Sequence, residues 1–230
     1  MRTEEKLTRA EYDRWMAKAD PWARQMRFLM GPVGALAVNT GALRLPRLLN
    51  LQPHQRLLDI GCGRASVLRL LWQRVPFDRP PVGLDISRVM LRLAGASRNG
   101  ASPHLAQGSV TSLPFPQESF DVVVAGHIIK HLSDGGVADC LREVWRVLTP
   151  GGVFAAWEFG PAPWSLWHRL NHRLLTLEVH TAHLRAFPQL AAIVAATPFR
   201  QARQLNLGLF LYPPIPRVAI LLRKDDSGGS

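Results

Sequence analysis

Cysteine is scarce in this chain, which has two cysteines in 230 residues. Cys62 lies in a Gly-rich turn and Cys140 in a helical pattern, so we expect no disulfide framework. Long uncharged apolar runs are also missing. The longest one near the start, residues 28–43, is too short and too interrupted by glycine and proline for a spanning helix, which needs about 20 apolar residues. Residues 1–5 lack the charged and then apolar pattern of a signal peptide, so we expect a cytoplasmic protein.

Acidic residues are also few. The chain carries 28 Lys and Arg against 17 Asp and Glu, a formal net charge of +11 at pH 7, and the basic residues are spread along it. This excess is compatible with a nucleic-acid partner or with an anionic membrane surface. It is equally compatible with a solvated basic surface in a protein of high arginine usage. The composition leaves these three explanations open.

The hydrophobic content of 47% is enough for the core of one large α/β domain. From residue 56 onward, short apolar runs alternate with patterns of helical period. The predicted strands are Arg56–Cys62, Pro81–Ile86, His104–Gly108, Phe120–Ile129 and Val153–Phe159. The predicted helices between them are Ala65–Val75, Ser87–Arg98 and Gly136–Leu148. Such alternation is typical of a parallel sheet with helices on both faces.

Two segments lie outside this alternation. Residues 1–50 have the pattern of amphipathic helices, and residues 160–185 form an insert rich in Trp, Leu, His and Arg that precedes a helix at Pro188–Ala196. The chain then closes with two strand-like runs, Arg203–Leu211 and Arg217–Arg223. The proline-rich link between these runs suits a hairpin at the edge of the sheet.

Ligands bind open parallel sheets at the carboxyl ends of the strands, where the strand order reverses. The first predicted strand runs into Gly61-Cys62-Gly63, whose glycines allow a sharp turn and a close approach of the backbone to a ligand. The second predicted strand ends at Asp85, which is placed to accept hydrogen bonds from both hydroxyls of a ribose. These two features indicate a ligand that contains a nucleoside.

Two further residues decide between nucleoside ligands. The dinucleotide-binding fingerprint Gly-x-Gly-x-x-Gly requires glycine at position 66, where this chain has Ser66. Asp59, just before the loop, would repel a pyrophosphate, whereas it suits a ligand with an ammonium group. S-adenosylmethionine has an ammonium, a sulfonium and a ribose but no phosphate, so the charges favour it as the cofactor.

Four stretches, in order along the chain, carry a more specific resemblance. They are Leu57–Gly63, Val82–Ser87, Leu113–Phe115 with Ser119–Asp121, and Arg146–Gly152. At this spacing they resemble the class I S-adenosylmethionine-dependent methyltransferases of the small-molecule type, close to the ubiquinone/menaquinone-biosynthesis-like group, over roughly residues 50–160.

The resemblance implies an α/β fold with a Rossmann-like, mostly parallel seven-stranded sheet of order 3-2-1-4-5-7-6 and helices on both faces. The final strand would be antiparallel and inserted next to the fifth. A helical cap over residues 1–50 would precede a methyltransferase domain over residues 51–224, with S-adenosylmethionine as cofactor. The low-complexity tail, residues 225–230, is expected to be disordered.

The resemblance also implies a role for each residue of the cofactor site. The methionine end would contact Asp59, Gly61 and Gly63, with Cys62 in their loop, and the ribose would contact Asp85. The adenine would contact Ile86, Ser109 and Val110, and the sulfonium region would contact the backbone of Gly126. Other roles stay open for three of these residues. Asp59 could brace the loop, Asp85 could cap the next helix, and Ser109 could be a turn residue.

Two positions depart from the family pattern. Ser109 stands where the family usually has Asp, and Ala65 replaces a frequent Gly. A hydroxyl can still accept a hydrogen bond from the adenine amino group, without the charge-assisted gain of about 1 kcal/mol. Both departures bear on cofactor affinity rather than on cofactor identity.

Methyl transfer from a sulfonium is a direct displacement with a good leaving group, so holding nucleophile, methyl carbon and sulfur in line supplies most of the acceleration. A general base is needed only for an acceptor that is protonated at the working pH. His127 and His131, at the mouth of the fourth strand, are the candidate catalytic residues. A purely local hydrogen-bonding role for one or both is the alternative.

The insert over residues 160–185 is expected to act as a substrate lid. Its aromatic and aliphatic residues recur at three- and four-residue steps: Trp164, Trp167, Leu170, Leu174 and Leu177. This stripe fits an interfacial helix on a membrane or a roof packed on the sheet, and we favour the roof because such a stripe is more often core. Both interpretations predict a small hydrophobic acceptor, such as a quinone-like ring, a lipid or a natural product.

Four histidines of the insert, His168, His172, His180 and His183, invite a zinc interpretation. No Cys lies nearby, and the first pair lacks the Glu of a His-Glu-x-x-His pattern. We therefore expect no metal in the site.

Two other functions are weighed against small-molecule methylation. The net charge would draw an RNA or protein methyltransferase to its substrate, but many such enzymes carry Asn/Asp-Pro-Pro-Tyr/Phe at the end of the fourth strand, where this chain has Ala125-Gly126-His127-Ile128. Nucleic acid is therefore not the expected partner, while peripheral contact with an anionic membrane stays open. The second alternative is a non-catalytic, membrane-associated member of the fold, which Ser109 and Ala65 would permit. The sequence indicates neither the acceptor atom nor the oligomeric state.

Overall fold

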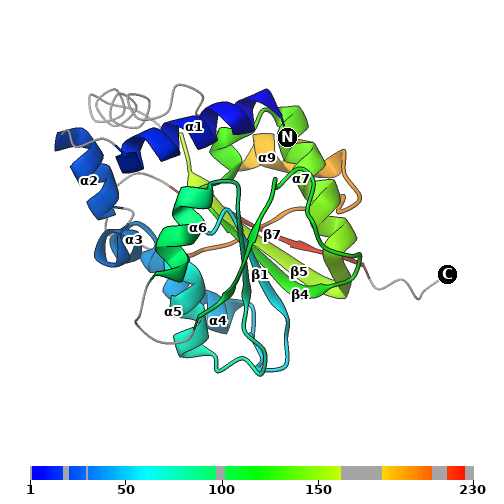
Figure 1. Cartoon of the computed structure of the whole chain (residues 1–230). Helices are drawn as coiled ribbons and strands as arrows, with labels where there is room; N and C mark the ends of the chain where they lie inside the picture. Colours follow the sequence, from blue (N-terminus) through cyan, green and yellow to red (C-terminus); the bar gives the residue numbers. More distant parts are fainter. Residues whose placement is uncertain are drawn as a thin grey trace.

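The structure, a computed structural model, describes residues 2–17, 21–29, 31–96, 102–161, 183–208 and 217–225 (Figure 1). Its centre is a seven-stranded sheet of order β3-β2-β1-β4-β5-β7-β6. The strands are β1 Leu57–Ile60, β2 Val82–Asp85, β3 His104–Gln107, β4 Phe120–Gly126, β5 Leu148–Phe159, β6 Arg203–Gln204 and β7 Arg217–Arg223. Strands β1 to β5 are parallel, and β7 pairs antiparallel with both β5 and β6. The predicted strand order, with its antiparallel insertion next to the fifth strand, is confirmed.

Strand β4 shows why these residues form a central strand. It pairs with β1 through Leu58 opposite Val123 and with β5 through Val123 opposite Phe154. Because side chains alternate along a strand, Val123 packs into the core on one face of the sheet and Val124 into the core on the other. A strand covered on both faces reads as a continuous apolar run, which is the pattern that predicted it.

Helices cover the two faces of the sheet. On one face lie α7 (Asp134–Val147) and α9 (Phe187–Ala195), and on the other α5 (Ser66–Arg74) and α6 (Arg88–Gly95). Serines cap α6 and α7, because the Ser87 and Ser133 hydroxyls each accept a hydrogen bond of 3.2 Å from a backbone N–H three residues on.

The N-terminal residues form a series of short helices. They are α1 Thr3–Ala17, α2 Pro21–Leu29, α3 Pro32–Val38, the 3-10 helix η1 Thr40–Arg44 and α4 Leu45–Leu48. Helix α1 contacts α6 and the 3-10 turn η2 (Ile129–His131), and it lies across one end of the sheet (Figure 1). Within the ranges that the structure describes, no helix is long and apolar enough to cross a membrane.

The predicted strand Arg203–Leu211 is too long. It ends at Gln204, because the Asn206 side chain accepts a hydrogen bond of 2.9 Å from the backbone N–H of Gly208 and Gly208 has a φ of +75°. An Asn side chain that bonds two residues on, followed by a left-handed glycine, is the chemistry of a turn. Residues 209–211 of the prediction lie outside the described residues.

Two boundaries around the site also differ from the prediction. Strand β5 begins at Leu148 rather than at Val153, because Leu148 already pairs with Phe120 across a register shift. Strand β4 ends at Gly126 rather than at Ile129, because the next residue has a φ of +58° and leaves the strand. Both candidate histidines therefore lie in a turn.

Most of the insert lies outside the described residues, including its Trp and Leu stripe and His168, His172 and His180. The chain resumes at His183, whose backbone N–H donates to the carbonyl of Lys130 at 2.7 Å. The buried Arg185 guanidinium donates to the carbonyls of Ile129 and Leu132 at 3.2 and 2.7 Å. The segment that follows the insert is thus fixed to the turn after β4.

Candidate active site

The loop after β1 turns sharply toward the ends of the neighbouring strands. The backbone N–H groups of Gly61 and Cys62 both donate to the carbonyl of Leu84, at 2.7 and 2.9 Å. Gly61 has a φ of +72°, and a Cβ there would lie 2.8 Å from Cδ1 of Ile128. Gly63 has a φ of +52° with open space around it. Both glycines are therefore required by the backbone, and Gly61 also by its neighbour.

The backbone conformation of Ala65 bears on one of the two departures from the family pattern. It has φ +57° and ψ 28°, the left-handed conformation, immediately before α5. A non-glycine residue in this region is strained by roughly 1–2 kcal/mol, whereas glycine is not. The position that often carries Gly in the family is thus a left-handed position here too.

Asp59 is a buried carboxylate at the end of β1. Burial, and then the negative charge of Asp85, raise the pKa of Asp59 to about 8. Within the described residues, no cation or hydrogen-bond donor is paired with it. A cation that entered this site would stabilise the charged form and lower the pKa again.

Asp85 links the loop after β1 to the start of α6. Its Oδ2 accepts a hydrogen bond from the backbone N–H of Gly63 and its Oδ1 one from the backbone N–H of Ser87, both at 2.8 Å. Burial raises the pKa of Asp85 although these backbone bonds lower it. The N-cap of α6 is Ser87 rather than Asp85. Each carboxylate oxygen keeps a further lone pair for a ligand hydroxyl.

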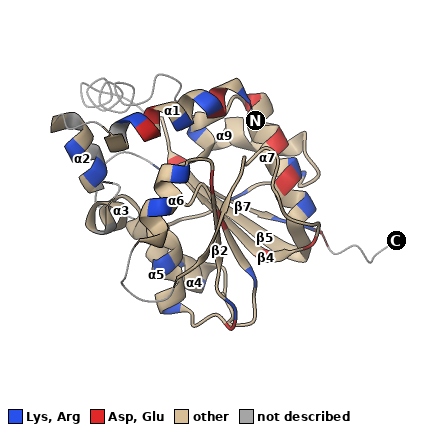
Figure 2. Cartoon of the chain, in the orientation of Figure 1, with Lys and Arg blue, Asp and Glu red and all other residues tan. Residues whose placement is uncertain are grey.

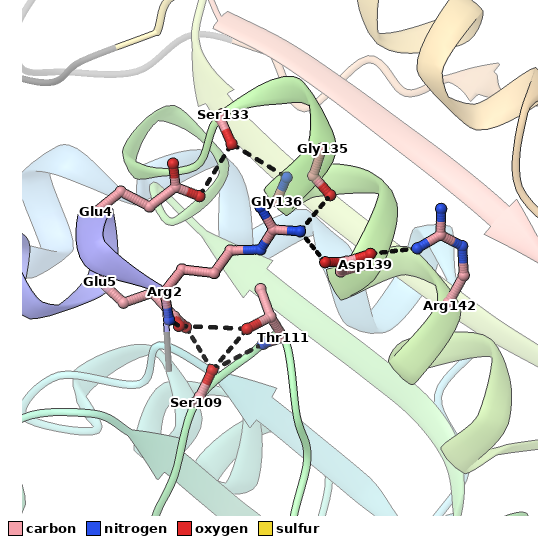
Figure 3. A network of polar contacts seen from close by, with 10 residues as sticks. All are labelled: Arg2, Glu4, Glu5, Ser109, Thr111, Ser133, Gly135, Gly136, Asp139 and Arg142. Carbon is pink, nitrogen blue, oxygen red and sulfur yellow. Dashed lines mark hydrogen bonds and ion pairs between the residues drawn. The ribbon is translucent and has the colours of Figure 1, made fainter.

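Polar side chains of the N-terminal residues hold α1 over the carboxyl ends of the strands (Figure 3). Glu5 is buried, and its carboxylate accepts hydrogen bonds from the hydroxyls of Ser109 at 2.6 Å and Thr111 at 3.2 Å. Glu4 accepts a hydrogen bond of 3.1 Å from the Ser133 hydroxyl, and Arg2 is paired with Asp139. Helix α1 therefore contacts the segments that follow β3 and β4.

Two more side-chain contacts hold α1 in this position. Asp13 accepts a hydrogen bond of 2.6 Å from the Ser87 hydroxyl, and the Tyr12 hydroxyl lies 3.3 Å from Nε2 of His131. Ser109, meanwhile, accepts a hydrogen bond of 3.1 Å from the backbone N–H of Thr111, as a turn residue does. The Ser109 hydroxyl thus serves both the turn and α1.

His127 and Glu158 form a buried pair at the ends of β4 and β5. Nδ1 of His127 lies 3.2 Å from Oε1 of Glu158, and the imidazole stacks on Phe159 with ring centroids 4.3 Å apart. Glu158 also accepts hydrogen bonds from the backbone N–H of Lys130 at 3.1 Å and from that of Phe159 at 2.8 Å. The Lys130 ammonium lies 3.4 Å from the same carboxylate.

The charges around this pair determine its protonation. Although burial alone would raise the pKa of Glu158, the charge of Lys130 and the hydrogen bond to His127 lower it below its ordinary value. Burial lowers the pKa of His127 to about 4, against the opposing influence of Glu158. The ionised Glu158 can only accept, so the imidazole proton is on Nδ1 and Nε2 carries the lone pair. Nε2 is buried and has no partner among the described residues.

The remaining predicted residues lie around this edge. His131 is buried, and burial and the charge of Lys130 lower its pKa well below the ordinary value. Gly126 permits a close approach, because a Cβ there would lie 2.6 Å from Cζ2 of Trp157. Burial raises the pKa of the Cys62 thiol, which is therefore protonated, and Val110 is buried in the core.

Comparison with known proteins places this chain in a family. Residues 58–156 match the methyltransferase domain family. The demethylmenaquinone methyltransferase of Roseiflexus castenholzii is 30% identical over 169 residues, which cover 74% of this chain and 66% of that protein. The enzyme of the same name from Symbiobacterium thermophilum is 34% identical over 114 residues, covering 47% of this chain and 44% of that protein. This chain belongs to the class I S-adenosylmethionine-dependent methyltransferases.

Solved structures agree on the fold of this methyltransferase. A chain from a complex between a methyltransferase activator and a methyltransferase of Haloferax volcanii aligns with a TM-score of 0.71 at 18% identity, covering 96% of this chain and 99% of that one. An S-adenosylmethionine-dependent methyltransferase of Methanosarcina mazei aligns with a TM-score of 0.61 at 24% identity, covering 79% and 98%. The family and its methyl donor, S-adenosylmethionine, are as the sequence predicted. This chain spans between 44% and 66% of the length of the two sequence relatives.

Sequence reasoning missed Glu158, Lys130 and the acidic side chains of α1. Glu158 had a signal, since it is the one charged residue in the apolar run of β5. A charged residue inside a buried strand is rare unless it is paired. No signal in the sequence marked Glu5, because its partner Ser109 is 104 residues away.

Proposed function

We propose that this methyltransferase transfers the methyl group of S-adenosylmethionine to a small, apolar, quinone-like acceptor. The observation that carries the cofactor assignment is Asp59, a buried carboxylate beside the Gly61–Gly63 loop that no described residue neutralises. The ammonium of the methionine moiety supplies the cation that this carboxylate lacks. The acceptor class is supported by the relatives, which are named for a menaquinone precursor.

The other cofactor contacts follow the strand ends. Asp85 accepts hydrogen bonds from the ribose hydroxyls through the lone pairs that its backbone bonds leave over. Ile86 packs on the adenine, with Ser109 and Val110 at its edge. The backbone of Gly126 borders the sulfonium region.

When bound, held by Asp59, Asp85 and the Gly61–Gly63 loop, S-adenosylmethionine would supply an activated methyl group together with a good leaving group. His127 then acts as the base for an acceptor that carries a proton, since Nε2 is an acceptor without a partner among the described residues. Its pKa of about 4 keeps the imidazole neutral at physiological pH. Glu158 holds the tautomer and stabilises the positive charge that forms on the ring. His131, held by Tyr12, has a positioning role.

Calorimetric titration with S-adenosylmethionine tests the cofactor assignment. Asp85→Ala is expected to weaken binding by at least about tenfold, because two charge-assisted hydrogen bonds are lost. Asp85→Asn separates loss of charge from loss of shape, and Asp78→Ala, an exposed aspartate beyond α5, is the matched control. Equal affinity in Asp85→Ala and in the control would contradict the assignment.

A further inference from the structure

The N-terminal helices carry an unusual set of exposed side chains. Every exposed large hydrophobic residue in the part of the chain that the structure describes lies before residue 50: Leu7, Phe28, Val33, Leu36 and Leu48. Phe28 and Val33 are the most exposed of them, at 63% and 69%. Single exposed apolar residues are ordinary on any surface, whereas a group of them marks a contact site.

Three of these residues belong to two helices that pack against each other. Phe28 is in the last turn of α2, and Val33 and Leu36 are three residues apart on α3, so they share one side of that helix. Helices α2 and α3 contact each other directly (Figure 1). We call Phe28, Val33 and Leu36 the α2–α3 face.

The charge around this face has one sign. Between residues 21 and 58 the chain has no Asp or Glu, and the two charged residues of α2, Arg24 and Arg27, are both basic. Arg24 is exposed and stands four residues before Phe28, on the same side of α2. In Figure 2 the ribbon of α2 carries the blue of Lys and Arg and none of the red of Asp and Glu. An apolar face with a basic border is complementary to a surface that is negative outside and apolar within.

We infer that the α2–α3 face docks on an anionic lipid bilayer. Phe28, Val33 and Leu36 enter the boundary between head groups and acyl chains, while the arginines remain at the level of the phosphates. A bilayer fits better than a folded protein partner, because a leaflet presents uniform negative charge along the whole basic side of α2.

The face adjoins the site. The guanidinium of Arg64, in the loop after β1, donates to the carbonyl of Arg27 at 3.5 Å, and α3 contacts α5. Asn39, just after α3, accepts a hydrogen bond of 2.8 Å from the indole N–H of Trp157 on β5. Docking therefore brings the cofactor edge next to the lipid. If the proposed function holds, this is where an apolar acceptor is concentrated, although the docking itself does not depend on methyl transfer.

Vesicle flotation of the full chain tests the inference. The chain is expected to bind vesicles of phosphatidylcholine with phosphatidylglycerol, to bind vesicles of phosphatidylcholine alone far less, and to dissociate as salt is raised. The triple variant Phe28→Ser, Val33→Ser, Leu36→Ser is expected to lower the partition coefficient by about tenfold or more. Leu48→Ser, an exposed leucine on α4, is the apolar control.

The contribution of the basic border is tested with a matched pair of arginine variants. Arg24→Gln is expected to lower partitioning about fivefold. Arg74→Gln, an exposed arginine at the far end of α5, is expected to leave it unchanged. Thermal melts of each variant confirm that the exposed substitutions leave the fold intact.

Three results would overturn the inference. They are equal binding to neutral and anionic vesicles, unchanged binding in the triple variant, and a triple variant whose defect is lost self-association in sedimentation rather than lost lipid binding. S-adenosylmethionine titration of the same variants reports separately on the proposed function. A chain that floats with anionic vesicles but binds no cofactor would reject methyl transfer and keep the docking.

Discussion

Two sets of acidic side chains lie at the same edge of the sheet and differ in their surroundings. Asp59 and Asp85, at the ends of β1 and β2, have no cation beside them among the residues that the structure describes, and burial raises the pKa of each. Glu158, at the end of β5, has Lys130 and His127 as partners, and its pKa is lowered. The difference is that the first set lacks a positive charge that the second contains. The two sets therefore differ in whether a described residue supplies the positive charge.

Removing the Glu158 carboxylate should have the largest effect on stability. Glu158→Ala removes the carboxylate that faces the buried Lys130 ammonium, which keeps its hydrogen bond to the carbonyl of His127, and the free energy of unfolding should fall by about 3–5 kcal/mol. Urea denaturation measures it. Glu11→Ala, a partly exposed position of α1, is the control and should change stability little. A loss below about 1 kcal/mol in Glu158→Ala would mean that the other contacts of Lys130 compensate for the lost carboxylate.

Asp59 should affect how the free energy of unfolding depends on pH. A carboxyl whose pKa is raised by folding holds its proton more tightly in the native state, so stability falls as pH rises from the ordinary pKa, about 4, to the raised one. For Asp59 the raised value is about 8. Each such group contributes at most about 1.4 kcal/mol per pH unit in this window. Asp59→Asn should flatten the fall measured by urea denaturation at several pH values.

Two further measurements test whether Asp59 causes this pH dependence of stability. Asp78→Asn, at an exposed position, should keep the slope of the wild-type protein. Saturating S-adenosylhomocysteine should reduce the slope in the wild-type protein, because its ammonium favours the ionised Asp59. A slope that persists in Asp59→Asn would assign it to Asp85, the other carboxyl with a raised pKa at this edge.

The smallest effect concerns a fourth carboxylate, Glu5, which accepts hydrogen bonds from two hydroxyls and from the backbone N–H of Arg2. Ser109→Asp would restore the residue usual in the family, but it places a second negative charge against Glu5. We expect a destabilisation of about 1 kcal/mol, relieved in the double variant with Glu5→Gln. Thermal melts of the four proteins in this cycle measure the coupling. Additive effects would show that Glu5 moves away from an aspartate at position 109.

The sequence predicted the sheet well, because buried parallel strands are continuous apolar runs and their order follows from the family motifs. It failed where one local side chain decides the outcome, as with Asn206 and the early end of β6. The loop with Asp59 was found because its residues are adjacent in the chain. The pair His127 and Glu158 spans 31 residues and depends on the register of β4 against β5, which a single sequence does not display.

The contacts of α1 also bear on the order in which the chain folds. Glu5 and Glu4 find their partners 104 and 129 residues further along, at Ser109 and Ser133. During synthesis the N-terminal end emerges first, so this helix exists long before the turns that receive it. Its acidic side chains stay in water until the ribosome has passed residue 133. Helix α1 can therefore dock over the cofactor edge only after the turns that hold Ser109 and Ser133 have been made.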